Sequence, residues 1–242
     1  MDLEAVLNHR RAVKIFDPEK PLDSSKVKHC LELATLAPSS SNMQLWEFYH
    51  ITDKQVITAM KKACMDQLSV GTASDVVVFV TRQDLYRKRA RAILEFERGN
   101  IQRNSPKDRH KSRIKDRELY YGKLMPFLYS RFLGLIGLVR KCIVWTAGLF
   151  RPVVYEVSEA DIRVVVHKTC ALAAQTFMIA MASEGYDTCP IEGFDRKRIK
   201  KILHLPKGAE INMVIPCGIR KGAESIWGER FRIPFEEVYH SV

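Results

Sequence analysis

Metal-binding and dinucleotide-binding motifs are missing from this sequence. Its six cysteines are scattered between Cys30 and Cys217, without a Cys-x-x-Cys pair or a histidine-rich partner segment. This spacing argues against a zinc site and against a disulfide framework, so we expect no metal and free, largely buried thiols. No Gly-x-Gly-x-x-Gly motif follows a predicted strand. A separate dinucleotide-binding domain is therefore not expected.

Long uninterrupted apolar runs are also missing. The apolar segment 124–154 is interrupted by four basic residues, Arg131, Arg140, Lys141 and Arg151. It falls short of the roughly 18 apolar residues of a transmembrane helix, so no membrane span is expected. A buried or interface-forming helical pair is the favoured interpretation. A helix that lies on a membrane surface is the alternative, because Trp145 and several leucines stand among the arginines.

Length, composition and charge limit the class of protein. The 242 residues are 46% hydrophobic, which is enough for the core of one α/β-type domain. The acidic start, residues 1–4, has no apolar core, so no secretory signal is indicated and a cytoplasmic location is expected. Much of the net charge of +11 lies in residues 82–117. The favoured interpretation of this charged run is a solvent-exposed face. Few aromatics interleave with these cations, so no nucleic acid is expected as a partner.

The hydrophobic pattern predicts alternating helices and strands. Strands are predicted at 46–52, 75–81 and 210–219, and the run Asp75–Thr81 is typical of a strand buried on both faces. Helices are predicted at 2–11, from Asp23 or Ser24 to near Pro38, at 54–68, at 161–184 and at 195–203. Helix 161–184 is apolar on most sides and is expected to be central. Residues 85–122 are helix-permissive, with breaks expected at Gly99-Asn100 and Ser105-Pro106.

Four motifs stand in a particular order along the chain. They are "RRAVKIF" (10–16), "APSSSNMQLWEF" (37–48), "EGYDTCPIEGFD" (184–195) and "GERFRIP" (228–234). The first ends a short helix with two cations, which suit an anion. The second offers several hydroxyl and amide groups, which suit a ligand rich in oxygen atoms. In this order the motifs resemble the FMN-dependent nitroreductase family over most of the chain.

The resemblance implies a fold, an assembly and a reaction. The implied fold is α+β, a three-layer sandwich with a mostly antiparallel central sheet, in an intertwined homodimer with FMN at the interface. It implies one domain, 1–242, with a variable helical insertion at about 85–155 that acts as a lid or an enlarged dimer surface. The implied enzyme is a flavin oxidoreductase that passes hydride from NADH or NADPH through FMN to a nitroaromatic, quinone or similar acceptor, by a ping-pong mechanism.

The resemblance also assigns site residues. Arg10 and Arg232 are expected on the phosphate, with Arg11 beside them, and Lys14 and Arg230 near the ring edge. The hydroxyl-rich loop is expected to come from the partner subunit and to contribute Pro38, Ser39, Ser40, Asn42 and Gln44. The turn of Pro190, Ile191, Glu192 and Gly193 is expected against the ring, where a backbone N–H and not the Glu192 carboxylate makes the main contact. No catalytic side chain is assigned, since the chemistry belongs to the flavin.

Three residues depart from the family pattern. Ala12 stands where serine is common, Leu45 replaces a proline before Trp46, and Thr169 falls where many members carry glutamine. These departures leave the substrate class open. Two alternatives therefore remain. One is a family enzyme with a different reaction, such as dehydrogenation, dehalogenation or flavin breakdown. The other is a basic protein that binds nucleic acid or a membrane surface on a flavin-type fold.

Overall fold

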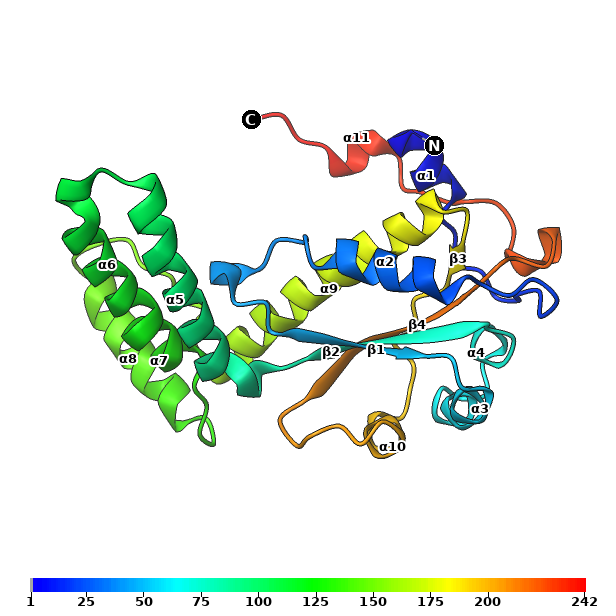
Figure 1. The fold of residues 1–242 in the computed structure, drawn as a ribbon, viewed down its shortest axis with the longest axis horizontal. Coiled ribbons are helices and arrows are strands. Elements are labelled where there is room, and N and C mark those ends of the chain that lie inside the picture. The colour runs from blue at the N-terminus through cyan, green and yellow to red at the C-terminus, as the bar shows by residue number, and fades with distance from the viewer. Residues whose placement is uncertain (1) are drawn as a thin grey trace.

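The core of the protein is one antiparallel sheet. In the computed structural model, which describes residues 2–242, the strand order is β1-β2-β4-β3 (Figure 1). The strands are β1 Trp46–Ile51, β2 Asp75–Thr81, β3 Asp187–Thr188 and β4 Glu210–Gly218. The three predicted strands are confirmed to within one residue at each end. The two-residue strand β3 was not predicted, because it is too short to show alternation.

Strand β2 is buried on both faces of the sheet. All seven of its residues are buried, as its continuous apolar sequence predicts. Alternate side chains enter different cores. Val76, Val78 and Val80 pack in one hydrophobic cluster, and Val77 and Phe79 pack in another on the opposite face.

Helices cover the two faces and make three layers (Figure 1). Helices α2 Ser24–Ala34 and α9 Glu159–Ser183 cover one face, and α3 Lys54–Ala63, α4 Leu68–Gly71 and α10 Arg196–Ile202 cover the other. Aspartates cap three of these helices at their N-termini, Asp23, Asp53 and Asp195. Helix α9 has the length and hydropathy of a membrane span, but its inner face packs on the sheet. The predicted central helix is confirmed.

Residues 86–148 form a helical lobe at one end of α9 (green in Figure 1). It contains α5 Tyr86–Asn104, α6 His110–Leu119, a π-helical turn Tyr120–Leu124, α7 Met125–Tyr129 and α8 Leu135–Gly148. Met43 and Leu45 enter its core with Ile162 and Val166 of α9. Glu210 at the start of β4 ties the lobe to the sheet. Its pKa is held well below the usual range by polar contacts with His167, Arg163 and Arg131.

Short elements complete the chain. They are α1 Leu3–His9, α11 Phe235–Val238 and the 3₁₀ turns Ser40–Asn42, Gln83–Leu85, Lys107–Arg109 and Ala223–Ser225. The six cysteines are free, and Cys142 is exposed whereas the others are buried. The prediction of free, largely buried thiols is thus confirmed.

Three predictions for the helices need correction. Gly99 and Asn100 do not break α5, because a glycine in a helix costs only about 1 kcal/mol and the burial of Ile101 offsets it. The predicted helix 54–68 ends at Ala63 and turns before α4, with Met65 and Asp66 in the left-handed conformation. Segment 124–154 was expected to form a buried or interface-forming helical pair, and for helix α8 the first of these is wrong. Most of its apolar side chains are exposed.

Candidate functional site

The segment after α1, residues 10–16, carries three cations that are partly or fully exposed. Between Arg10 and Phe16 the chain forms isolated β-bridges at Ala12 and Phe16 and bends at Lys14, and Val13 and Phe16 are fully buried. The backbone is fixed on both sides, because Val13 N donates to Thr188 O at 3.2 Å and Lys14 N donates to Ser225 O at 2.8 Å. Ala12 and Lys14 are exposed on either side of the buried Val13, and Arg10 is partly exposed. Ala12 forms a bridge to Thr188 and offers no hydroxyl there.

Arg10 lies in a group of cations that lacks a counter-ion. Its guanidinium donates no hydrogen bond within residues 2–242. Burial lowers the pKa of Arg10, and three neighbouring cations lower it further: Arg230, Arg232 and Arg11. A partly buried cation among like charges is stabilised by an anion. This place therefore fits a phosphate group, which accepts paired hydrogen bonds from a guanidinium.

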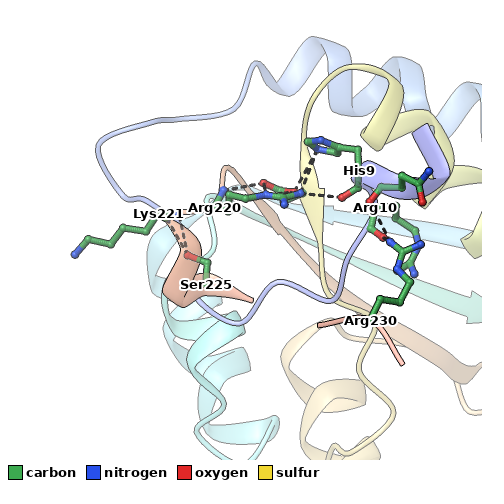
Figure 2. Close-up of polar contacts among 9 residues, drawn as sticks. His9, Arg10, Arg220, Lys221, Ser225 and Arg230 are labelled. Atoms are coloured by element: carbon green, nitrogen blue, oxygen red, sulfur yellow. Dashed lines mark hydrogen bonds and ion pairs between the residues drawn. The ribbon is translucent and has the colours of Figure 1, made fainter. Parts of the chain in front are cut away.

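The other arginines of the group hold the backbone. Arg230 donates to the carbonyls of Leu7 at 3.1 Å, Asn8 at 3.0 Å and Arg10 at 2.8 Å, and so satisfies the last carbonyls of α1 (Figure 2). Arg11 donates to Gly228 O at 3.0 Å. The donors of Arg230 thus point to α1 and not to open space. The remaining cation beside the predicted ring position is Lys14, whose Nζ lies 3.7 Å from Cys189 Sγ.

The turn 190–193 presents backbone donors. Ile191 is buried and exchanges two backbone hydrogen bonds with Val214, at 2.8 and 3.1 Å. Pro190 has no N–H. Within residues 2–242 the N–H groups of Glu192 and Gly193 have no hydrogen-bond partner. The main-chain contact expected at this turn therefore falls to Glu192 or Gly193.

Gln67 supports this turn and was missed by the sequence analysis. Its Nε2 donates to Gly193 O at 3.0 Å. Gln67 follows Met65 and Asp66, whose φ angles of 58° and 55° are unusual for residues other than glycine. Such strain is common at functional sites. The only sequence signal was the polar pair Asp66-Gln67 at the point where apolar helical spacing stops.

Asp187 and Arg220, which the sequence did not indicate, hold the cationic segment through its backbone. Asp187 is 2% exposed at its side chain and accepts hydrogen bonds from Arg220 N at 2.8 Å and Nε at 3.0 Å. Arg220 Nη2 donates to Asp187 and also to His9 O at 2.9 Å, as Figure 2 shows. His9 Nε2 lies 3.4 Å from Asp187 Oδ1. This group links β3, the end of β4 and the residue that precedes Arg10.

The hydroxyl-rich loop is held in a strained conformation. Ser41, Asn42 and Gln44 have φ angles of 52°, 53° and 47°. Two tyrosines of the lobe hold it. Tyr120 OH and Ser41 Oγ share a hydrogen bond of 2.8 Å, and Tyr121 OH donates to Ser41 O at 3.1 Å. Leu45, which stands where the family pattern has a proline, is buried in the lobe core.

A cavity opens beside this loop. Its volume is about 290 Å³, and it lies between Asn42–Gln44 and the α5 residues Arg89, Ala92, Ile93 and Phe96. Arg89 Nε is buried there without a hydrogen-bond partner among residues 2–242. Gln44 Nε2 donates to Asn42 Oδ1 at 2.9 Å, and Ser39 Oγ accepts from Gln44 N at 3.2 Å. The loop is thus preorganised.

The predicted site residues fall into two separate groups. Figure 1 shows the loop between α2 and β1 beside the α5–α8 lobe, whereas α1 and β3 lie toward the other end of α9. Pro38, Ser39, Ser40, Asn42 and Gln44 belong to the first group. Thr169 lies on the same half of α9, where its hydroxyl donates to Val166 O at 3.0 Å. One chain does not bring this group to Arg10 and the turn 190–193.

The fold and the cationic site define an α+β protein that can hold an anionic ligand beside the edge of its sheet. A model of the nitroreductase family matches residues 7–219, so the chain belongs to the nitroreductase family and is an oxidoreductase of that class. MhqN of Bacillus subtilis, regarded as an NAD(P)H nitroreductase, is 24% identical over 96% of this chain and 95% of its own length.

Two further relatives extend the comparison. The 4-nitrobenzoate reductase of Pseudomonas putida is 26% identical over 91% of this chain and 85% of its own length. A crystal structure from Exiguobacterium sibiricum, of a protein regarded as a nitroreductase in complex with FMN, covers 100% of this chain and 98% of that one. Its TM-score is 0.70 at 18% identity, so this likeness shows the shared fold.

Proposed function

We propose that the protein is an FMN-dependent enzyme that transfers hydride from NADH or NADPH to a nitroaromatic, a quinone or a similar acceptor, as a homodimer. The observation that carries the proposal is the Arg10 guanidinium, which lies without a partner among Arg11, Arg230 and Arg232. The relative from Exiguobacterium sibiricum was crystallised with FMN, and MhqN is regarded as an NAD(P)H nitroreductase. Both support the choice of ligand.

Each part of the site fits a part of FMN. Arg10, with Arg232 beside it, supplies charge-assisted hydrogen bonds for the phosphate. The N–H groups of Glu192 and Gly193 are donors for the ring edge, and Lys14 contributes positive charge there. When bound, the flavin supplies the hydride chemistry, and the chain contributes position and charge.

The homodimer brings the two groups of residues together in this proposal. A partner copy would place its Ser39–Gln44 loop, already fixed by Tyr120 and Tyr121, against the flavin. The C-terminal tail offers exposed anchors for such an assembly, since Trp227 is 91% and Phe231 is 80% exposed. The loop would then supply hydroxyl and amide groups for the ribityl chain.

The cavity beside the loop supports the proposal that α5 forms one wall of the acceptor pocket. Phe96 and Ile93 give it flat apolar surface, and Arg89 gives it a donor without a partner. A partly buried arginine favours an acceptor that carries a negative charge. The reductase from Pseudomonas putida is named for 4-nitrobenzoate, which is such a molecule. We therefore include aromatic acids among the acceptors to be tried.

The absorbance spectrum of the purified protein tests this proposal. We expect a yellow protein, or one that turns yellow on incubation with FMN, whose flavin absorbance is bleached by NADH or NADPH under anaerobic conditions. Reoxidation by 4-nitrobenzoate or a benzoquinone would then identify the acceptor class. A protein that binds no FMN, or bound FMN that neither nicotinamide reduces, contradicts the proposal.

Gly193→Ala is expected to weaken FMN binding at least tenfold and to leave folding unchanged. A Cβ at Gly193 would meet only Gln67 Nε2, at 3.8 Å, so the chain itself has room for it. The added methyl group would instead occupy space at the proposed ring edge. Fluorescence titration with FMN and the melting temperature of the apoprotein measure the two effects. Gly122→Ala, in the lobe, is the matched control because no atom lies within 4 Å of its Cβ position. Unchanged FMN affinity in Gly193→Ala would refute the expected contact.

A further inference from the structure

Helix α8 carries an apolar stripe on its outward side. Leu135, Leu138, Val139 and Trp145 are 56%, 61%, 52% and 72% exposed. Positions 135, 138, 139, 142, 145, 146 and 149 follow the i, i+3, i+4, i+7 spacing of one helix face, which also includes Cys142 and Thr146. On the opposite side Gly137 and Arg140 are buried. The helix thus turns apolar surface toward solvent, where a surface helix usually carries charge.

Both ends of α8 extend this surface. Before the helix, the turn presents Phe132 at 60% and Leu133 at 89% exposure, and after it Phe150 is 84% exposed. Leu133 has a φ of 49°, a conformation that is strained for leucine. The Glu159 carboxylate holds the turn by accepting hydrogen bonds from Phe132 N at 2.9 Å and Gly134 N at 3.0 Å. The turn that presents Phe132 and Leu133 is therefore fixed by hydrogen bonds.

The exposed charged residues of segment 119–155 are all basic, whereas Arg140 is buried and Arg131 pairs with Glu210. Residues 119–155 contain five cations and no aspartate or glutamate. The cations are Lys123, Arg131, Arg140, Lys141 and Arg151. If a second copy covered the stripe through a two-fold axis, it would bring the exposed cations Lys141 and Arg151 toward the same cations of the other copy. A negatively charged surface complements this charge.

We propose that α8 and the turn before it, residues 131–150, bind the surface of an anionic lipid bilayer. Leucine, phenylalanine and tryptophan side chains of an interfacial helix enter the acyl boundary, while lysine and arginine pair with headgroups. The 14 residues of α8 measure about 21 Å, less than the roughly 30 Å of a bilayer core, so the helix lies along the surface. This inference goes beyond the proposed function, because it concerns where the protein is held and not its reaction.

Co-sedimentation of the full-length, FMN-incubated protein with vesicles tests this proposal. We expect binding to phosphatidylcholine vesicles with a quarter of phosphatidylglycerol to exceed binding to pure phosphatidylcholine at least tenfold. The excess should fall as NaCl rises from about 0.05 to 0.5 M, because salt screens the headgroups. Equal binding to both vesicles, or no binding to either at low salt, overturns the proposal.

Matched variants assign the binding to α8. Leu138→Ser with Trp145→Ser removes apolar contact, and Lys141→Glu with Arg151→Glu reverses charge; each pair should lower vesicle binding at least tenfold. Lys197→Glu with Lys201→Glu makes the same charge change on exposed residues of α10 and should lower it much less. Flavin absorbance and near-ultraviolet circular dichroism of the variants show that the fold is kept. An equal loss in the α10 variant would mean that net charge alone drives binding and would overturn the assignment to α8.

Fluorescence and sedimentation provide independent readouts. In Trp227→Phe the remaining tryptophans are Trp46, which is buried, and Trp145, which is exposed. Anionic vesicles should shift the emission of this variant to shorter wavelength, because Trp145 leaves water. If the α8 variants instead change the protein from dimer to monomer and keep vesicle binding, a second copy covers the stripe and the proposal is wrong.

Discussion

Replacing Arg10 by alanine should weaken FMN binding by about 100-fold and leave the apoprotein as stable as the parent or more stable. The loss in affinity corresponds to two charge-assisted hydrogen bonds of roughly 1.5 kcal/mol each. The stability of the apoprotein moves in the other direction, because Arg10 has no hydrogen-bond partner within residues 2–242 and is repelled by Arg230, Arg232 and Arg11. A residue with a purely structural role would instead lower the stability of the apoprotein when it is replaced.

Fluorescence titration with FMN and chemical unfolding of the apoprotein measure both quantities for Arg10→Ala. The control is Arg109→Ala, an exposed arginine in the turn between α5 and α6, which should change neither. If Arg10→Ala lowers the free energy of unfolding by more than about 1 kcal/mol and leaves FMN affinity alone, Arg10 is structural. In that case the anion site lies elsewhere.

Asp187→Ala should lower the free energy of unfolding by about 3 to 5 kcal/mol, the largest effect on stability that we expect. Asp187 is buried and is the carboxylate that pairs with Arg220, so its loss leaves a partly buried guanidinium without a counter-ion. FMN affinity should fall as well, because Arg220 Nη2 donates to His9 O, next to Arg10. Urea unfolding at equilibrium and flavin titration are the measurements.

An exposed ion pair provides the comparison for Asp187. Glu184 pairs with Lys26 at 3.0 Å across α9 and α2, and Glu184→Ala should cost less than about 1 kcal/mol. The double variant Asp187→Ala with Arg220→Met should recover part of the loss, since it removes the unpaired cation together with its partner. A loss no greater than that of Glu184→Ala would show that the buried pair does not hold the N-terminal segment.

The sequence predicted the parts of the fold whose signal is local. The run Asp75–Thr81 was recognised because its five central residues, 76–80, are all apolar and leave no polar face, and Asp23 lies where a helix cap belongs. Local pattern could not place α8. An apolar helix has the same sequence pattern whether its stripe faces a core, a second chain or a lipid surface. The stripe faces outward because Gly137 lies against Ser158 and Glu159 and Arg140 is buried on the same inner side.

The candidate site shows the same division. Arg10, Lys14 and the turn 190–193 were proposed as site residues from motifs whose members stand close together in the chain. Asp187, Arg220 and Gln67 were missed, because Asp187 and Arg220 are 33 positions apart and Gln67 meets Gly193 across 126 positions. The expectation that Arg230 faces the ring is not supported by its contacts, which go to α1 carbonyls.

The sequence by itself determined the three long strands, the central helix and the family, because periodicity and motif order are properties of neighbouring residues. Tertiary structure alone decided which arginine stays without a partner, which backbone N–H groups remain free, and which face of α8 meets solvent. Hydrogen bonding and burial depend on what other segments bring to the same place. That information exists only after the chain has folded.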